Sequence, residues 1–188
     1  MPRICIDPGH GGSDPGACGN GLRECDVALV VSNKVRGYLE AVGYEVVMTR
    51  ETDVDVAYRG ASATAELQAR CDISDRFGAD VFISIHCNAA GNPAALGAET
   101  YCYAASTNGR RLARCIQAQL AGLSMVDRGV KDNPLYVTGH AAAVAALAEL
   151  GFISNPDDAV KLGDPRWRDE FARALARGVT DYFAGVGV

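Results

Sequence analysis

The sequence predicts a single α/β domain whose sheet is largely parallel. Short apolar runs alternate with longer segments of helical periodicity, a pattern typical of strand–helix–strand units. The run at residues 80–85 is mostly apolar, as expected for a strand in the middle of a sheet. A length of 188 residues fits one domain with a substantial core, so we take residues 1–188 as one unit.

The N-terminal half is expected to hold three strands and two helices. The glycine-rich segment before Glu24 is predicted to be a turn and a loop, because glycine and proline interrupt regular structure. Gly43 and Gly78 are positioned to end the two helices. The expected bounds are strands at 3–6, 44–48 and 80–85, and helices at 24–42 and 58–76.

The C-terminal half is expected to add three strands and two helices. Residues 88–96 and 127–134 are polar or contain proline and glycine, so both segments are predicted to be loops. The expected bounds are strands at 97–103, 135–138 and 145–149, and helices at 108–123 and 165–183.

Charge and hydropathy exclude several classes of protein. A net charge of −5 gives no support for nucleic-acid binding or for a basic membrane-binding surface. No apolar run approaches the roughly 20 residues that span a bilayer. The first residues predict a strand instead of a signal peptide. We therefore expect a chain that is made in the cytoplasm without a signal peptide, or a mature fragment of a secreted protein.

The cysteines predict no disulfide framework. The chain has seven, an odd number, and they form no closely spaced pairs. We expect most of them to be small buried residues in a reducing environment.

Two histidines and one glutamate form a candidate metal site. His10 follows the first strand, His86 ends the third, and Glu24 lies between them in sequence at the start of a helix. In α/β sheets, ligands bind beyond the carboxyl ends of the strands, which is where these residues fall. Two histidines and one carboxylate leave a position open on tetrahedral Zn²⁺, as catalytic zinc sites require. We expect one zinc ion per chain.

Glu149 is the candidate for proton transfer at this site. It ends the last apolar run, where an unpaired carboxylate is costly to bury. Zinc lowers the pKa of a bound water from 15.7 toward about 7, and a nearby carboxylate can pass the water's proton to a leaving amine. The residues alone therefore predict a metal-assisted hydrolase and leave its substrate open.

Each of these residues also has an ordinary interpretation. His10 could be a polar turn residue, His86 a hydrogen-bonded core histidine, and Glu24 a first-turn residue that favours the helix dipole. The glycines at 9–21 match neither a P-loop nor a dinucleotide-binding fingerprint. No cysteine-protease signature accompanies the histidines. Only the combination of residues is specific.

A series of short motifs runs in order through nearly the whole chain. It comprises IDPGHGG at 6–12, DPGA at 14–17, GLRE at 21–24, GYEV at 43–46, TR at 49–50, LQAR at 67–70, ADVFISIHCNA at 79–89, GAET at 97–100, RGVK at 128–131, LYV at 135–137 and ELGFISN at 149–155. In this order the motifs closely resemble the zinc-dependent N-acetylmuramoyl-L-alanine amidases of bacterial cell-wall hydrolases and phage endolysins.

The resemblance implies a twisted, mostly parallel six-stranded sheet with helices on both faces. It implies zinc ligands at His10, Glu24 and His86, with Glu149 as the catalytic carboxylate. It further implies a peptidoglycan substrate, cleaved at the amide between the lactyl group of N-acetylmuramic acid and the L-alanine of the stem peptide. The expected place of action is the cell wall.

Three further residues are candidates for substrate binding. Arg128 and Lys131 could reach acidic groups of the peptide or lactyl unit, and Asn88 lies in the same motif as His86. His140, the third histidine, is expected at the surface or in a substrate groove.

Two alternatives remain open at this point. The same site could serve a zinc peptidase that acts on another amide, or a catalytically silent wall-binding or activator module could keep the fold. The presence of all three ligands and the carboxylate argues against the silent module. The sequence indicates neither an oligomeric state nor a preference for one wall chemistry.

Overall fold

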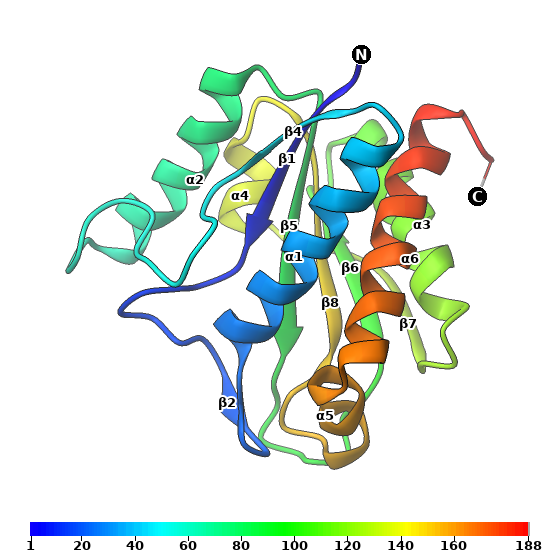
Figure 1. Cartoon of the computed structure of the whole chain (residues 1–188). Helices are drawn as coiled ribbons and strands as arrows, with labels where there is room; N and C mark the ends of the chain where they lie inside the picture. The colour runs from blue at the N-terminus through cyan, green and yellow to red at the C-terminus, as the bar shows by residue number, and fades with distance from the viewer. Residues whose placement is uncertain (188) are drawn as a thin grey trace.

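The computed structural model describes residues 1–187, which form one α/β domain around a six-stranded sheet (Figure 1). In spatial order the strands are β4 (Glu45–Met48), β1 (Arg3–Pro8), β5 (Val81–Asn88), β8 (Val144–Phe152), β6 (Ala98–Cys102) and β7 (Asp127–Asp132). Neighbouring strands run parallel, except that β6 is antiparallel to β8. The predicted fold class is confirmed.

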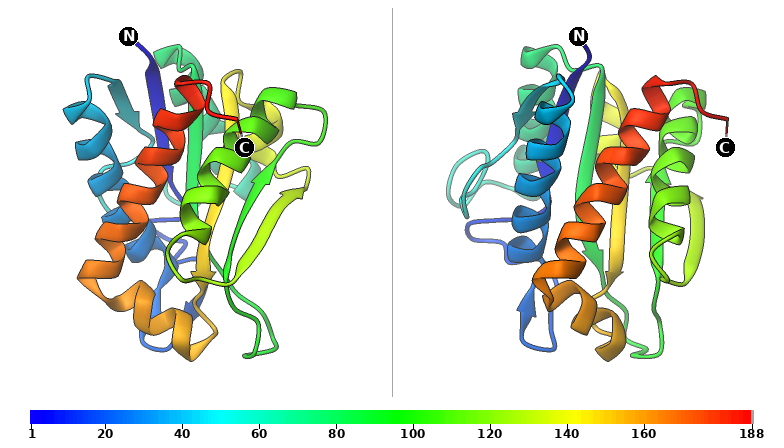
Figure 2. Two further views of the ribbon diagram at one scale, coloured as in Figure 1. Left: turned by 90° about the vertical axis from the view of Figure 1, so that its right-hand side faces the viewer. Right: turned by 45° about the vertical axis from the view of Figure 1, so that its right-hand side comes forward.

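Helices cover both faces of the sheet (Figure 2). One face carries α1 (Glu24–Ala41), α3 (Thr107–Ala121) and α6 (Pro165–Phe183), which pack together over the larger hydrophobic core. The other face carries α2 (Ala63–Phe77) and the short α4 (Tyr136–His140) over a smaller core. A cavity lies on this second face, between α2, α4 and the sheet.

The alternation of side chains along β8 decides which residues face this cavity. Ala146 and Ala148 contact the larger core, whereas Leu147 contacts the smaller one. Because successive side chains in a strand point to opposite faces, Glu149 projects to the same face as Leu147. Glu149 is paired in register with His86 on β5, so both side chains lie on the α2 and α4 face.

Two predicted elements near residue 130 are wrong. Residues 127–134, predicted as a loop, contain strand β7, and the predicted strand at 135–138 is largely helix α4. β7 is an edge strand that pairs only with β6, so it can be polar along its length and gives no apolar signal. The five residues of α4 are too few to show helical periodicity. Its buried Val137 gives the apolar pattern expected of a strand.

Other differences concern the ends of elements and short additions. The helix predicted at 58–76 begins at Ala63, because the Ser62 hydroxyl accepts a hydrogen bond from the backbone N–H of Ala65 and caps it. Three elements have no predicted counterpart: helix α5 (Pro156–Gly163) and the hairpin strands β2 (Cys18–Gly19) and β3 (Leu22–Arg23).

All seven cysteines are free thiols, and six of them are buried, as predicted for most of them; Cys18 is exposed. Within residues 1–187, no helix combines the length and the apolar character needed to cross a membrane.

Candidate metal centre

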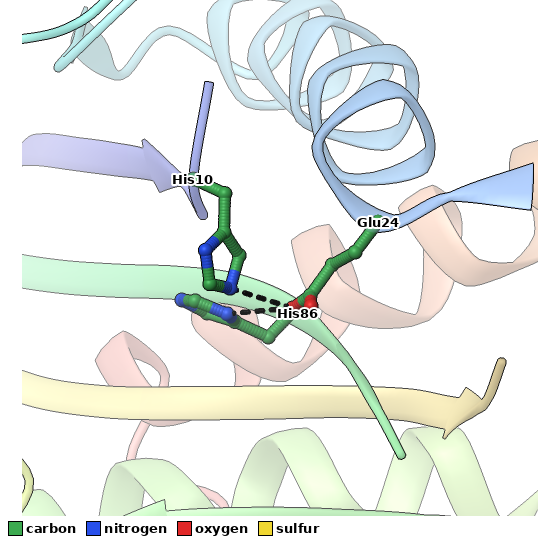
Figure 3. A group of neighbouring side chains, drawn as sticks. All are labelled: His10, Glu24 and His86. Atoms are coloured by element: carbon green, nitrogen blue, oxygen red, sulfur yellow. Dashed lines mark hydrogen bonds and ion pairs between the residues drawn. The ribbon is translucent and has the colours of Figure 1, made fainter. Parts of the chain in front are cut away.

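His10, Glu24 and His86 converge at the carboxyl ends of β1 and β5 (Figure 3). His10 Nε2 lies 3.2 Å from Glu24 Oε1, and His86 Nδ1 lies 2.8 Å from the same oxygen. The two imidazole rings meet edge to face, with centroids 5.0 Å apart. One ligand atom from each of the three residues lies within 4.8 Å of the other two. The structure thus brings together the three side chains that the sequence proposes as ligands.

Glycines around His10 allow this close approach. His10 has a positive φ of 56°, a conformation that costs a non-glycine residue roughly 1–2 kcal/mol, so its surroundings must hold it. A Cβ atom on Gly9 would lie 2.3 Å from the His86 ring. A Cβ atom on Gly16 would lie 2.6 Å from the His10 ring and 2.7 Å from the Glu24 carboxylate. Larger residues at either glycine would therefore push the three side chains apart.

Asp14 orients the His10 ring from behind. His10 Nδ1 donates to Asp14 Oδ2 at 2.7 Å, and this leaves Nε2 directed toward Glu24. Burial disfavours the protonated ring, but hydrogen bonds to Glu24 and Asp14 outweigh burial and raise the pKa of His10 to about 9. Carboxylates behind metal-binding histidines commonly fix the ring in this way. Sequence reasoning missed Asp14, although it follows His10 by four residues in the same glycine-rich segment.

Glu24 is fixed by backbone donors at the start of α1. Its Oε1 accepts from the N–H of Cys87 at 3.0 Å, and its Oε2 accepts from the N–H of Ala17 at 2.9 Å. The side chain is buried, and burial alone would raise its pKa. Hydrogen bonds and charge from His10 and His86 outweigh burial and hold the pKa of Glu24 well below its usual range. Glu24 is therefore an ionised carboxylate, as a metal ligand must be.

Glu149 lies beside this cluster without a partner of its own. Its Oε2 is buried and accepts no hydrogen bond from any group in residues 1–187. Burial raises the pKa of Glu149 to about 7, and the nearby charges of Glu24 and Glu99 act in the same direction, although His86 opposes them. A carboxyl group that titrates near neutral pH can both accept and donate a proton there.

A second buried carboxylate, Glu99, lies opposite Glu149 on β6. Glu99 accepts hydrogen bonds from the Asn88 amide at 2.6 Å, the Tyr101 hydroxyl at 2.7 Å and the Arg128 guanidinium at 2.8 Å. Of the residues predicted to bind substrate, Asn88 and Arg128 therefore contact the protein's own Glu99. Glu99 was not among the sequence candidates, because its burial depends on pairing between distant strands.

Lys131 and His140, the other two candidates, are both exposed. Lys131 is exposed on β7 and pairs with Tyr101 of β6, whose side chain packs on the same face as Leu147. His140 is exposed at the end of α4, where its ring stacks on Tyr136 with the two centroids 4.0 Å apart.

The cavity opens on the metal-ligand cluster and extends between α2 and α4. Its volume is about 590 Å³, and His10, His86 and Glu149 line one end. Leucine, valine and tyrosine side chains from α2, β8 and the α4 region line its apolar part: Leu67, Leu135, Tyr136, Val137 and Leu147. Acidic residues also border it: Asp14, Asp55 and Glu66. The space suits a ligand with apolar groups that presents a reactive bond at one end.

The donor set of the cluster fits zinc. Two imidazole nitrogens and a carboxylate oxygen are ligands that Zn²⁺ accepts, and this combination leaves room for a fourth ligand. A second group of potential ligands, Cys25, Asp26 and Asp53, is different in character. The Arg23 guanidinium already binds the carboxylates of Asp26 and Asp53, so half of their negative charge is balanced within the protein.

Comparisons with known proteins agree on one family. The family described as N-acetylmuramoyl-L-alanine amidase matches residues 4–181. A germination-specific N-acetylmuramoyl-L-alanine amidase of Bacillus subtilis (strain 168) is 36% identical over 191 residues, which cover 98% of this chain and 81% of that protein.

Solved structures give the same result. The N-acetylmuramoyl-L-alanine amidase AmiC2 of Nostoc punctiforme superposes with a TM-score of 0.87 at 31% identity and covers 97% of both chains. The CwlD amidase from Clostridioides difficile, solved in complex with the GerS lipoprotein, superposes with a TM-score of 0.92 at 27% identity. That match covers 98% of this chain and 100% of the other.

Proposed function

The chain belongs to the N-acetylmuramoyl-L-alanine amidase family, and we propose that it cleaves peptidoglycan with one zinc ion and Glu149. The bond is the amide between N-acetylmuramic acid and the L-alanine of the stem peptide, and the place of action is the cell wall. The observation that carries the mechanism is a cluster of three potential ligands at the end of a cavity that also contains an unpaired buried carboxylate.

His10, Glu24 and His86 are the residues that would hold the zinc. His10 would bind through Nε2 and His86 through Nδ1, because these are the ring nitrogens that face Glu24. When bound, zinc lowers the pKa of a water toward about 7 and polarises a carbonyl group. Asp14 keeps the proton of the His10 ring on Nδ1, so that Nε2 stays available as a ligand atom.

Glu149 transfers the proton in this proposal. Its carboxylate takes the proton of the attacking water and delivers it to the nitrogen of the leaving L-alanine. Burial supports this role because it raises the pKa of Glu149 to about 7, where both the acceptor form and the donor form are populated at neutral pH. The C–N bond then breaks, so the stem peptide leaves with the free amino group of L-alanine. The water's oxygen stays on the lactyl carbon as part of a new carboxyl group, and Glu149 is again ionised.

In this proposal, the acidic groups of the substrate bind beside β6 and β7. Lys131 is exposed and lies in register with Tyr101, on the face of the sheet to which Glu149 projects. Arg128 is partly exposed and binds Glu99, which lies in register with Glu149. Asn88 contributes through Glu99, because its amide holds the carboxylate that in turn holds Arg128.

Product analysis tests this function. Purified peptidoglycan is digested, and the soluble products are identified by mass spectrometry. The amidase releases stem peptides with a free L-alanine amino group and leaves the lactyl carboxylate on the glycan. A zinc peptidase would cut within the peptides and leave L-alanine attached, and a silent module would release nothing. Either of these results would overturn the proposal.

A further inference from the structure

Two buried arginines bind the backbone of the turn that carries His10. The Arg50 guanidinium donates to the carbonyl oxygens of Pro8 at 3.1 Å and of Gly9 at 2.8 Å. The Arg70 guanidinium donates to the carbonyl oxygens of Pro8 at 2.8 Å and of His10 at 2.9 Å. Both side chains are almost fully buried, 3% and 4% exposed. The carbonyl oxygens of three consecutive residues, Pro8 to His10, therefore all accept hydrogen bonds from a buried arginine.

Arg50 also connects this turn to the helix that carries Glu24. The nitrogen that binds Gly9, Nη2, donates as well to the carbonyl oxygen of Cys25 at 2.9 Å. Cys25 directly follows Glu24 in the first turn of α1. One guanidinium nitrogen thus joins the segments of two proposed ligands.

Asp7 connects Arg70 to the strand that carries His86. Its Oδ1 accepts from Arg70 at 2.8 Å and from the Thr49 hydroxyl at 2.6 Å, and its Oδ2 accepts from the Ser84 hydroxyl at 2.6 Å. Ser84 lies on β5, two residues before His86. Asp7 is 1% exposed, so it supplies a buried negative charge that compensates the charge of Arg70.

The turn itself fits closely against Arg50. A Cβ atom on Gly11 would lie 2.7 Å from Arg50 Nε, and Gly11 has a positive φ of 125° that disfavours any other residue. The guanidinium group and the turn are therefore packed as one unit, and a shift of the guanidinium must move the backbone next to His10.

We propose that Arg50 and Arg70 are positioning residues that pre-form the metal site by fixing the backbone of all three ligand segments. This inference rests on the proposed zinc site at His10, Glu24 and His86. Neither arginine donates to a ligand side chain; both act through backbone carbonyl groups, and Arg70 also acts through Asp7. Without them, the unfavourable φ of His10 can relax and its ring turns away from Glu24.

Zinc affinity measured on the folded chain tests the inference. The dissociation constant is obtained by competition with a chromophoric chelator, and folding of the metal-free protein is followed by circular dichroism. We expect Arg50→Met and Arg70→Met to bind zinc about 10- to 100-fold more weakly, the usual effect of losing support behind metal ligands.

Lysine variants separate positioning from charge. Arg50→Lys and Arg70→Lys keep the positive charge, but a single nitrogen cannot reproduce the planar fork that binds two carbonyl groups. We expect these variants to fold and still to bind zinc about tenfold more weakly than the unmodified chain. They carry the test if the methionine variants do not fold, and unchanged zinc affinity in the lysine variants would overturn the inference.

Gln117→Met is the matched control. Gln117 is 4% exposed and donates to the carbonyl oxygen of Ala98 and to Asp127, away from the metal-ligand cluster. Its loss should lower stability and leave the zinc affinity unchanged. If the arginine variants behave like this control, the arginines are structural only and the proposed function stands. If the unmodified chain binds no zinc, the proposed function falls together with this inference.

Discussion

Glu149 lies directly across from His86 in the parallel register of β8 and β5. Residues paired in this way project to the same face of the sheet, so a buried carboxylate is placed beside a proposed ligand without being part of the ligand cluster. The two side chains lie near the carboxyl ends of neighbouring strands and line the same cavity. Proton transfer and metal binding can therefore be separated by mutation.

Substitution of Glu149 should abolish turnover while zinc stays bound. General acid–base groups typically contribute about 10²- to 10⁴-fold to rate, so we expect Glu149→Gln and Glu149→Ala to lose activity on purified peptidoglycan in that range. Zinc content per chain, measured by atomic absorption, should stay at one. Full activity in Glu149→Ala would remove the role that we assign to this residue.

Substitution of Asp14 should weaken zinc binding rather than proton transfer. Asp14 binds Nδ1 of His10, the ring nitrogen that faces away from Glu24. Loss of such a partner usually lowers metal affinity by about 10- to 100-fold. We expect this loss in Asp14→Ala and a smaller one in Asp14→Asn, whose amide oxygen can still accept from Nδ1. At saturating zinc, Asp14→Asn should regain most of its activity. A variant that stays inactive with zinc bound would indicate a direct role of Asp14 in the reaction.

Removal of the metal should inactivate the enzyme without unfolding it. Both histidines already bind Glu24, and none of the three proposed ligands belongs to the core below them. We expect activity to disappear with chelator and to return with one equivalent of zinc. Zinc at a thousandfold excess over its Kd stabilises by about 4 kcal/mol, which raises the melting temperature by roughly 8–16 °C in a domain of this size. A melting temperature that does not change when zinc is added would contradict zinc binding at this site.

The positions of the proposed ligands were accessible to sequence reasoning because each lies at the end of a strongly patterned element. His10 follows an apolar strand, His86 lies near the end of another, and Glu24 begins a helix. The groups that support them were not accessible, since Arg50 and Arg70 lie 41 and 60 residues from the carbonyl groups of Gly9 and His10 that they bind.

The errors in the predicted fold have the same origin. β7 has six residues of mixed polarity, and its single partner strand, β6, lies 25 residues or more before it along the chain. Strand pairing of this kind depends on tertiary structure, and no local sequence pattern predicts it. Glu99 is hidden for the same reason, because only the sheet reveals that it lies opposite Glu149.

The buried Asp7 should make stability depend on pH. Burial raises its pKa, but Arg70 and the hydroxyl donors outweigh burial and hold the pKa below its usual range. A lowered folded-state pKa stabilises above the unfolded value of about 3.9, and this contribution is lost as pH falls through the folded value. Asp7→Asn leaves Arg70 without its closest charge partner, which typically costs about 3–5 kcal/mol for a buried pair.

Urea unfolding across a pH series measures this effect. The stability difference between the unmodified chain and Asp7→Asn should be largest at neutral pH and should shrink below about pH 4. Asp169→Asn is a suitable comparison, because the Asp169 carboxylate binds Lys34 and Arg173 at a more exposed position. Its effect should be much smaller, and equal effects of the two variants would show that burial does not set the strength of the Asp7 pair.

Arg128 should affect substrate binding more than turnover. Its guanidinium is partly exposed, lies over the Phe152 ring and binds Glu99 next to Glu149. We expect Arg128→Ala to raise KM for peptidoglycan fragments about tenfold with little change in kcat, because a charge that binds the substrate in both ground and transition states acts on KM. The control for this prediction concerns Glu99. Arg128→Ala leaves the buried Glu99 carboxylate without its cation, which by itself can distort the site.

The double variant Arg128→Ala/Glu99→Gln removes the negative charge of Glu99 as well. A raised KM that persists in the double variant indicates direct substrate contact by Arg128, whereas a KM restored to the original value assigns the effect to the orphaned Glu99 carboxylate.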